Sequence, residues 1–452
     1  MLPPSTSGPV SQSPPALADG TELLGKYEGS GRVEAPFLVR RADGRMLELS
    51  PLLYTVARYL DGRRSVDDIA SVVSAETGRR LSGENVAYLV TEKLNPLRVL
   101  RGTPSTEERP AGAPILGLHL RFGVVPKGAV RFIAGLLRPL FVPVVVLLML
   151  VALAATDTWL VLAGRVGAST SQLLYRPGWL LAVAGLTLVG GAFHELGHAT
   201  ASRYGGAQPG AIGAGVYLLW PVFYNDLNDS YRLGRAGRLR ADLGGVYFNA
   251  VYAVMLFALY GATGYRPLLL VAALQHFVIL QQFLPFVRLD GYYVVSDLAG
   301  VPDLFGRIRP LLAAVFLGRH ATNSGWRDLR PRARSIVTAW ILLTVPLLGA
   351  GVVFLIISTP HLLTIGAGVV RADWRLLIPA VRSHHVVTAT LLAVQLLAVS
   401  LPVLGVSSAL IRALLRLGSS ADARPPGSAP VFGLGALIAI LFVVGLGSLA
   451  VR

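Results

Sequence analysis

Two histidines and a glutamate occur together in the sequence HELGH, which runs from His194 to His198. On an α-helix, residues four positions apart lie on one face, so both imidazoles can bind a single metal ion. Zinc held by two such histidines activates a water molecule, and Glu195 beside them can take the proton from that water. The spacing therefore predicts His194 and His198 as zinc ligands and Glu195 as a catalytic base.

The residues that precede this motif are apolar. The stretch LLAVAGLTLVGGAF, from Leu180 to Phe193, carries no charge, which is the composition of a membrane-spanning helix. Ionisable side chains at membrane depth are energetically unfavourable, and by default they indicate a functional site. The alternative is a helix that carries two packed histidines, but that alternative gives Glu195 no reason to lie in an apolar helix.

The composition of the whole chain agrees with a membrane location. Its 452 residues include only 15% charged residues, and the mean hydropathy is +0.58, which predicts a polytopic α-helical membrane protein. There is no cysteine, so the ligands of any metal must be His, Asp or Glu. The net charge of +16 comes almost wholly from arginines in loops beside apolar spans, where the positive-inside rule expects them. We therefore expect a lipid bilayer, and no nucleic acid, as a partner.

Changes in composition divide the chain into four segments. Residues 1–24 are rich in Pro, Ser and Gly and are expected to form a disordered tail. Residues 25–104 are predicted to fold as a small α+β domain, and residues 105–131 are expected to be a Pro/Gly-rich linker. Residues 132–452 form the predicted membrane domain, with its core at 178–300. The first hundred residues lack the apolar stretch of a signal peptide, so none is expected.

The predicted N-terminal domain consists of a hairpin followed by three short helices. The hairpin covers Phe37 to Leu49, with Asp-Gly at its turn, and Ser50, Ser65 and Ser82 are expected to cap the helices. This order resembles the PqqD-like domain, a winged-helix-like module that binds the leader segment of precursor peptides. The resemblance implies peptide binding. A winged-helix domain that binds DNA, and a packing domain without a binding function, remain open.

Apolar stretches predict six or seven membrane spans. Residues 205–242 are too broken by Gly and Pro for a span and are expected to be re-entrant or extended. Residues 360–381 are apolar but interrupted, and the sequence predicts no element for them. The expected spans lie at about 132–155, 178–204, 243–262, 267–287, 335–357, 386–410 and 430–450.

Arginine-rich segments indicate the topology and a third ligand. Arginines cluster in residues 205–242 and 288–334, whereas the loop 156–177 has few, so both clusters and the N-terminal domain are expected in the cytoplasm. HELGH then lies near the cytoplasmic end of its span, at the same depth as Asp290 at the end of the fourth span. Because a catalytic zinc needs three protein ligands, Asp290 is the candidate third ligand.

Two motifs together carry a resemblance to a known family. HELGH in one span and LPFVRLDG at the end of a later span resemble the site-2 protease-like intramembrane zinc metalloproteases. The match is closer to a bacterial subgroup labelled peptide zinc metalloprotease, through PVFYNDLNDSYRL, RLRADLGGVYFN and RLDGYYVVSDL. The resemblance covers roughly residues 190–300 and implies that Asp290 is the third zinc ligand. Where the family commonly has asparagine this chain has Gln282, and the usual PDZ domain is not evident.

These observations predict a zinc endopeptidase in the cytoplasmic (inner) membrane of a bacterium, in which Glu195 takes the proton of the attacking water. The N-terminal domain favours a ribosomally made precursor peptide as substrate. The alternatives are regulated cleavage of a membrane signalling protein and a non-catalytic, peptide-binding export component. A zinc-dependent carrier ranks lowest, because transport does not need the glutamate of HELGH.

Other polar residues have two interpretations each. Asn249 either lines the active site or forms a hydrogen bond with a neighbouring helix, and the second is slightly favoured. Asp226 and Asp229 are expected to stabilise a turn rather than approach the metal. His276 is not expected to be a ligand, because it lies about 20 Å from Asp290 along a helix.

Overall fold

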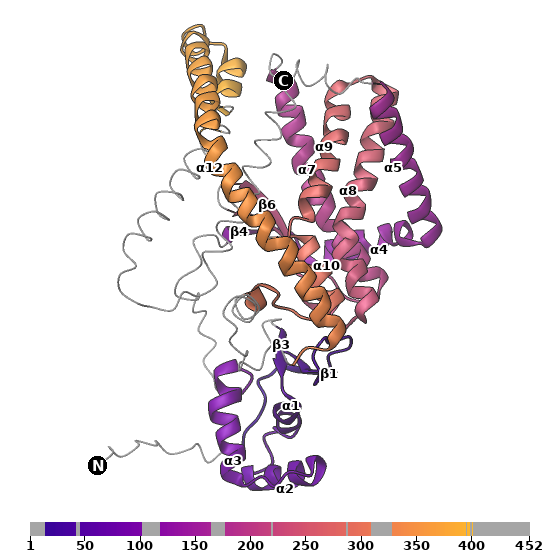
Figure 1. Cartoon of the computed structure of the whole chain (residues 1–452), viewed down its shortest axis with the longest axis vertical. Coiled ribbons are helices and arrows are strands. Elements are labelled where there is room, and N and C mark those ends of the chain that lie inside the picture. The colour runs from indigo at the N-terminus through magenta and orange to yellow at the C-terminus, as the bar shows by residue number, and fades with distance from the viewer. Residues whose placement is uncertain are drawn as a thin grey trace, which may run out of the picture. The chain divides into compact units, whose positions relative to one another are not determined.

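A computed structural model gives the fold of most of the chain. The chain divides into an N-terminal unit, Met1–Ala111 with Asp328–Arg330, and a helical unit, Gly112–Arg327 with Pro331–Arg452 (Figure 1). The structure describes residues 14–41, 46–101, 118–163, 177–217, 220–285, 288–308, 328–394, 396–397 and 400.

The sheet of the N-terminal unit has three antiparallel strands in the order β1-β2-β3. Strand β1 is Glu22–Lys26, β2 is Phe37–Arg40 and β3 is Met46–Leu49. Pairing of Phe37 with Leu49 confirms the predicted hairpin, whose expected turn lies outside the described residues. Strand β1 was not predicted from the sequence, because a single short segment carries no turn that would indicate a hairpin.

Helices α1 (Pro51–Arg58), α2 (Val66–Thr77) and α3 (Gly83–Tyr88) begin directly after the three serines predicted to cap them. Each serine hydroxyl accepts a hydrogen bond from a backbone N–H of the first turn, at 3.2–3.3 Å. These bonds satisfy donors that have no partner within a helix. The last helix continues as η1 (Leu89–Leu94) and η2 (Asn95–Leu97).

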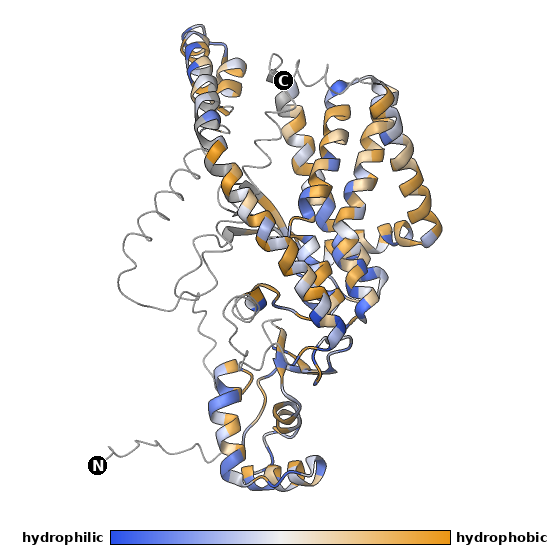
Figure 2. Cartoon of the chain, in the orientation of Figure 1, coloured by the Kyte–Doolittle hydropathy of each residue, from blue (hydrophilic) through white to orange (hydrophobic). Residues whose placement is uncertain are grey.

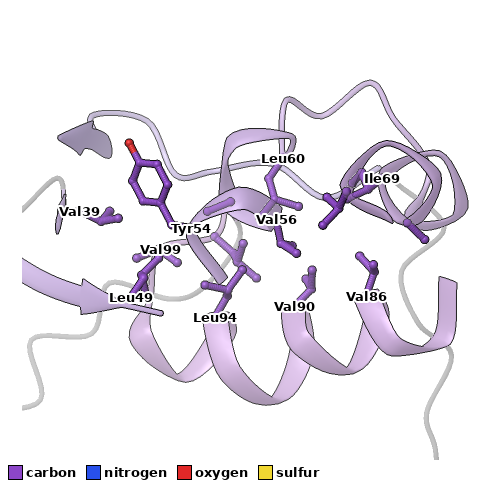
Figure 3. Close-up of a cluster of buried hydrophobic side chains, with 14 residues drawn as sticks. Val39, Leu49, Tyr54, Val56, Leu60, Ile69, Val86, Val90, Leu94 and Val99 are labelled. Carbon is purple, nitrogen blue, oxygen red and sulfur yellow. The ribbon is translucent and has the colours of Figure 1, made fainter. Parts of the chain in front are cut away.

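A continuous apolar core joins the helices to the sheet. Figure 3 shows Val86, Val90 and Leu94 pointing toward Val56 of α1. Burial of apolar surface contributes about 25 cal/mol per Å², so a core with members from both sheet and helices stabilises this unit by itself. The buried members are Val39, Leu49, Tyr54, Val56, Ala57, Leu60, Ile69, Ala70, Val73, Val86, Val90, Leu94, Val99 and Leu100.

The expected disordered tail, residues 1–24, is partly wrong. Residues 14–24 are described, and Leu17 pairs with Leu100 through an antiparallel bridge. Leu17 and Leu23 pack against the core of the unit. These two leucines bury enough apolar surface to order a segment whose composition is otherwise that of a tail.

A segment far along the chain also belongs to the N-terminal unit. Asp328–Arg330 pairs with residues 31–33: Val33 N–H donates to Asp328 O at 2.6 Å, and Arg330 N–H donates to Gly31 O at 2.7 Å. Leu329 between them is fully buried. The chain therefore returns to this unit immediately before the long helix that begins at Pro331.

The helical unit contains long apolar helices, and among its described residues three helices are long and apolar enough to cross a membrane: Pro143–Leu162, Arg235–Thr263 and Pro331–Gly351. Figure 2 shows α5 coloured as hydrophobic along most of its length. The largely helical fold is confirmed, and the spans expected beyond residue 400 lie outside the described residues. The helices are α4 (Lys127–Leu137), α5 (Pro143–Ala163), α7 (Pro177–Tyr204), α8 (Arg235–Thr263), α9 (Arg266–Gln282), α10 (Asp290–Ala299) and α12 (Pro331–Arg382).

The first predicted span is divided in the structure, and a later predicted span is part of a longer helix. The sequence predicts one span at 132–155, but α4 ends at Leu137 and α5 begins at Pro143, with η3 (Arg138–Phe141) between them. Pro139 and Pro143 lack the N–H groups that a continuous helix needs. Toward the C-terminus a helix is longer than predicted. Helix α12 has 52 residues and continues through the stretch 360–381, for which the sequence predicts no element.

The expected linker, residues 105–131, is also shorter than predicted. Strand β4 (Leu118–Val125) lies within it and pairs with β5 (Ile212–Tyr217), which pairs in turn with β6 (Trp220–Asn225). The prediction failed because β4 finds its partner almost a hundred residues away. The extended backbone of β5 and β6 is one of the two conformations that the sequence predicts for 205–242.

Candidate metal site

Helix α7 brings the two histidines of HELGH together. Their Nε2 atoms lie 3.1 Å apart, and both side chains are buried. This is the arrangement that the spacing predicts, because positions four apart on a helix lie one above the other. Neither ring is exposed to bulk water, so the two nitrogens face a site enclosed by protein.

Asp290 completes a group of three. Its Oδ2 atom lies 3.4 Å from Nε2 of His194, and its Oδ1 atom lies 3.3 Å from Nε2 of His198. One ligand atom from each residue lies within 4.8 Å of the others, so this buried group can hold a metal ion. Burial raises the pKa of the Asp290 carboxyl, but a positive charge on the facing His198 more than offsets it, so that with His198 protonated and no metal bound the pKa lies below its ordinary value.

Asp290 reaches the histidines from a different element than expected. The sequence places it at the end of the fourth span, whereas α9 ends at Gln282 and Asp290 is the first residue of the short helix α10. A Cβ atom on Gly291 would come within 2.8 Å of the Cα of Phe283. The glycine of the LDG sequence thus permits the start of α10 to approach the end of α9.

Gly245 of α8 leaves room beside the Nε2 atoms of the two histidines. A Cβ atom built there would lie 2.4 Å from Nε2 of His198 and 2.6 Å from Nε2 of His194. Atoms at that separation overlap, so the space in front of both nitrogens exists only because residue 245 has no side chain. This space, together with the His, His and Asp ligand set, fits a metal ion.

Helices α7 and α8 approach each other closely at a pair of glycines. A Cβ atom on Gly197, within HELGH, would lie 2.3 Å from the carbonyl oxygen of Gly244, and one on Gly244 would lie 2.6 Å from that of Gly197. Two facing glycines allow the backbones to pack together as they do in membrane helix pairs. This contact sets the distance between the histidines and α8.

The orientation of His198 is fixed by α8. Nδ1 of His198 donates a hydrogen bond to the carbonyl of Ala241 at 2.7 Å. A neutral imidazole protonated on Nδ1 has its lone pair on Nε2, which is the nitrogen that faces Asp290 and His194. Metal-binding histidines commonly have such a partner on their other nitrogen.

Glu195 lies next to the group without belonging to it. It is half-buried on the same turn of α7, and its backbone carbonyl accepts a hydrogen bond from Nδ2 of Asn225 at 3.2 Å. Asn225 ends strand β6, so the sheet and the HELGH turn are joined at this point. The backbone of Glu195 is therefore held beside the three candidate ligands by strand β6.

A buried ion pair attaches the helix of Asp290 to α8. Nε of Arg238 donates to Oδ1 of Asp297 at 2.9 Å, and the Arg238 side chain is only 2% exposed. The same guanidinium donates to the carbonyl of Leu233. Tyr231 lies near this pair, and burial raises the pKa of Tyr231 to about 12, so that its phenol remains protonated at neutral pH.

The other acids and histidines considered in the sequence lie elsewhere. The carboxylate of Asp226 accepts from the Asn228 N–H two residues on, which is the predicted turn, whereas that of Asp229 accepts from the N–H of Gln208, 21 residues earlier, and so joins two separate segments. Nε2 of His276 lies 2.6 Å from Oδ1 of Asp157, in a contact between α9 and α5, and His276 is not one of the three candidate ligands.

The sequence reasoning missed Gly245, Ala241 and Arg238, all on α8. The available signal was the segment RLRADLGGVYFN, in which Ala241 and Gly245 are four residues apart and share a helix face. No family model, curated protein or solved structure matches this chain.

Proposed function

We propose that this protein is a membrane-embedded zinc endopeptidase, with zinc held by His194, His198 and Asp290. The observation that carries the proposal is the convergence of these three buried ligands beside the space that Gly245 leaves open. Three protein ligands with one open position are characteristic of catalytic zinc, whereas structural zinc is usually bound by four.

The choice of zinc rests on the adjacent glutamate. Two histidines and one carboxylate also bind iron(II) in oxygenases, so the ligand set by itself does not identify the metal. A glutamate next to the first histidine is the general base of zinc hydrolysis. Glu195 lies in that position in an otherwise apolar helix, which favours hydrolysis.

The chain's own residues would then share the work of peptide hydrolysis. Zinc, when bound, supplies a Lewis acid that lowers the pKa of water and polarises the peptide carbonyl. Glu195 takes the proton from the attacking water and returns it to the leaving amine. His198 and His194 keep their Nε2 lone pairs directed at one point, and α8 shields that point from bulk water.

The sheet offers a place for the substrate. A peptide bond inside a helix is shielded by its own hydrogen bonds, so the substrate has to be extended at the site. Strand β6 is an edge strand of the described sheet, and its last residue, Asn225, is bonded to Glu195. An extended peptide that adds to this edge would pass the catalytic glutamate.

A ribosomally made precursor peptide is the substrate that we favour. The N-terminal unit has the hairpin and capped helices on which the resemblance to leader-binding modules rests. Arginine clusters near residues 205–242 and 288–334 support a bacterial inner-membrane protein with this unit in the cytoplasm. Regulated cleavage of a membrane signalling protein is the second candidate, and an export component that binds peptide without cleaving it is the third.

The first prediction concerns the metal. Purified wild-type protein should contain about one zinc per chain. Asp290→Ala should weaken zinc binding by at least the roughly 10–100-fold that loss of an outer-sphere partner causes. Elemental analysis measures the zinc content, and chelator competition measures the zinc affinity. Asp303→Ala, which removes an exposed carboxylate outside the site, is the control. Equal zinc content in wild type and Asp290→Ala would remove Asp290 from the site.

The second prediction separates binding from catalysis. Glu195→Gln should retain zinc and fold, because Glu195 is not a ligand, but it should slow peptide hydrolysis by about 10²–10⁴-fold, the usual contribution of a general base. Single-turnover cleavage of a precursor peptide by the zinc-loaded variant measures this loss. Cleavage at the wild-type rate would show that the hydrolytic mechanism is wrong.

A further inference from the structure

Two polar atoms beside the metal group lack hydrogen-bond partners among the described residues. Nδ1 of His194 and Nδ2 of Asn249 are both buried and form no hydrogen bond of good geometry. Asn249 lies in α8 and is only 1% exposed. Buried polar groups are nearly always paired, so two unpaired atoms at one site require an explanation.

Nδ1 of His194 and Nδ2 of Asn249 lie where the antiparallel helices α7 and α8 pack against each other. Ala241 of α8 accepts from His198, and Gly245, one turn later, lies against both histidine rings. Asn249 follows after one further turn on the same face. Because α7 runs in the opposite direction, the face of α8 passes His198 first and His194 afterwards. The Asn249 side chain lies close enough to the His194 ring to interact with it.

The chemistry of a metal-binding histidine then assigns the partner. If Nε2 of His194 binds the metal, its proton must be on Nδ1, which becomes a buried donor. The Asn249 side chain offers an oxygen acceptor at one end of its amide and a nitrogen donor at the other. With the oxygen turned toward His194, the unpaired Nδ1 gains an acceptor inside the protein.

We propose that Asn249 is a positioning residue, whose Oδ1 accepts the Nδ1 proton of His194 and directs the Nε2 lone pair of that ring at the metal. The proposal rests on the metal site proposed above. It gives His194 the partner that Ala241 provides for His198. The two histidines are thus oriented by one face of α8, one through a backbone carbonyl and the other through a side chain.

Metal affinity tests this role without measuring proteolysis. Asn249→Leu, which has a similar shape and no acceptor, should weaken zinc binding by about 10–100-fold. Asn249→Asp retains an acceptor oxygen and should bind zinc within a few-fold of wild type. Gln275→Leu is the matched control, because Gln275 is an equally buried amide on α9, packed near Gly190 rather than at the metal group. Chelator competition against zinc, with folding checked by circular dichroism, gives the three affinities.

A second measurement does not depend on any variant. In zinc-loaded wild type with ¹⁵N-labelled histidine, magnetic resonance should show a slowly exchanging proton on Nδ1 of His194. Wild-type affinity in Asn249→Leu, an equal loss in Gln275→Leu, or a His194 ring protonated on Nε2 would each overturn the proposal. If wild type fails to bind zinc, or binds it independently of Asp290, the proposed metal site is itself wrong. The two failures are therefore distinguishable.

Discussion

At residue 245 a single methyl group would occupy the space in front of the Nε2 atoms of His194 and His198. The candidate site depends on the lack of a side chain there, because the nearest ring atoms lie 2.4–2.6 Å from where a Cβ would be. Backbone strain does not explain this glycine, which lies within the regular helix α8. The close approach of the two histidine rings does.

Gly245→Ala should therefore abolish tight zinc binding, because the added methyl group overlaps both histidine rings and must displace them. Alanine is about 1 kcal/mol more favourable than glycine within a helix, so lost helix stability would not account for a loss of metal. We expect zinc affinity to fall by more than the roughly 10–100-fold typical of outer-sphere changes. Gly261→Ala, on the same helix with open space around it, is the control. Full zinc content in Gly245→Ala would show that the ion lies elsewhere.

At the scale of elements, the position of α10 determines whether Asp290, the candidate third ligand, reaches the histidines. The Arg238–Asp297 pair holds α10 to α8. On the other side, Tyr292 stacks on Phe305 with ring centroids 5.0 Å apart, and both rings pack against Trp340 of α12. Asp290 is thus positioned by a charged contact and an aromatic contact at once.

Asp297→Asn should loosen this helix and weaken zinc binding indirectly. Removing one partner of a buried ion pair costs about 3–5 kcal/mol, because the remaining charge is left uncompensated. We expect a lower thermal midpoint together with reduced zinc affinity. The double variant Arg238→Met with Asp297→Leu should recover much of the stability, since apolar replacement of such a pair is often neutral. Asp19→Asn, in an exposed pair, should change neither quantity. Unchanged zinc affinity in Asp297→Asn would show that the Arg238–Asp297 pair is not needed to position Asp290 at the site.

At the scale of the whole molecule, the chain has a unit with its own core and a helical unit with the candidate metal site. The N-terminal unit contains Asp328–Arg330 as well as the N-terminal residues, so two separate segments of the chain form it. If this unit binds the precursor peptide, as we propose, the peptide is tethered to the helical unit through the chain. Tethering of this kind gives an effective concentration of the order of mM for short flexible linkers.

Deleting residues 1–104 should slow cleavage of a full-length precursor by at least about tenfold, and cleavage of a short core peptide much less, because only the first depends on the tether. Initial rates on the two substrates measure the difference. Full-length Leu329→Ser is a useful control, since it disturbs the buried residue that the deletion would expose without removing the unit. Equal slowing of both substrates, or protease protection that places this unit outside the cell, would contradict the prediction.

The sequence by itself determined the features that depend on short-range geometry. Helical periodicity brought His194 and His198 together, and local caps fixed where α1, α2 and α3 begin. A cap or an i,i+4 pair involves neighbours along the chain, so its pattern is visible in the residues themselves. The hairpin formed by β2 and β3 is readable for the same reason.

Only the tertiary structure decided the features that depend on distant segments. It ordered residues 14–24, paired β4 with β5, and made Asp290 the start of α10 rather than the end of α9. Gly245 has no chemistry of its own, and its importance comes from which atoms α7 places opposite it. Long-range packing selects such partners by shape and burial, and these do not follow from local periodicity or composition.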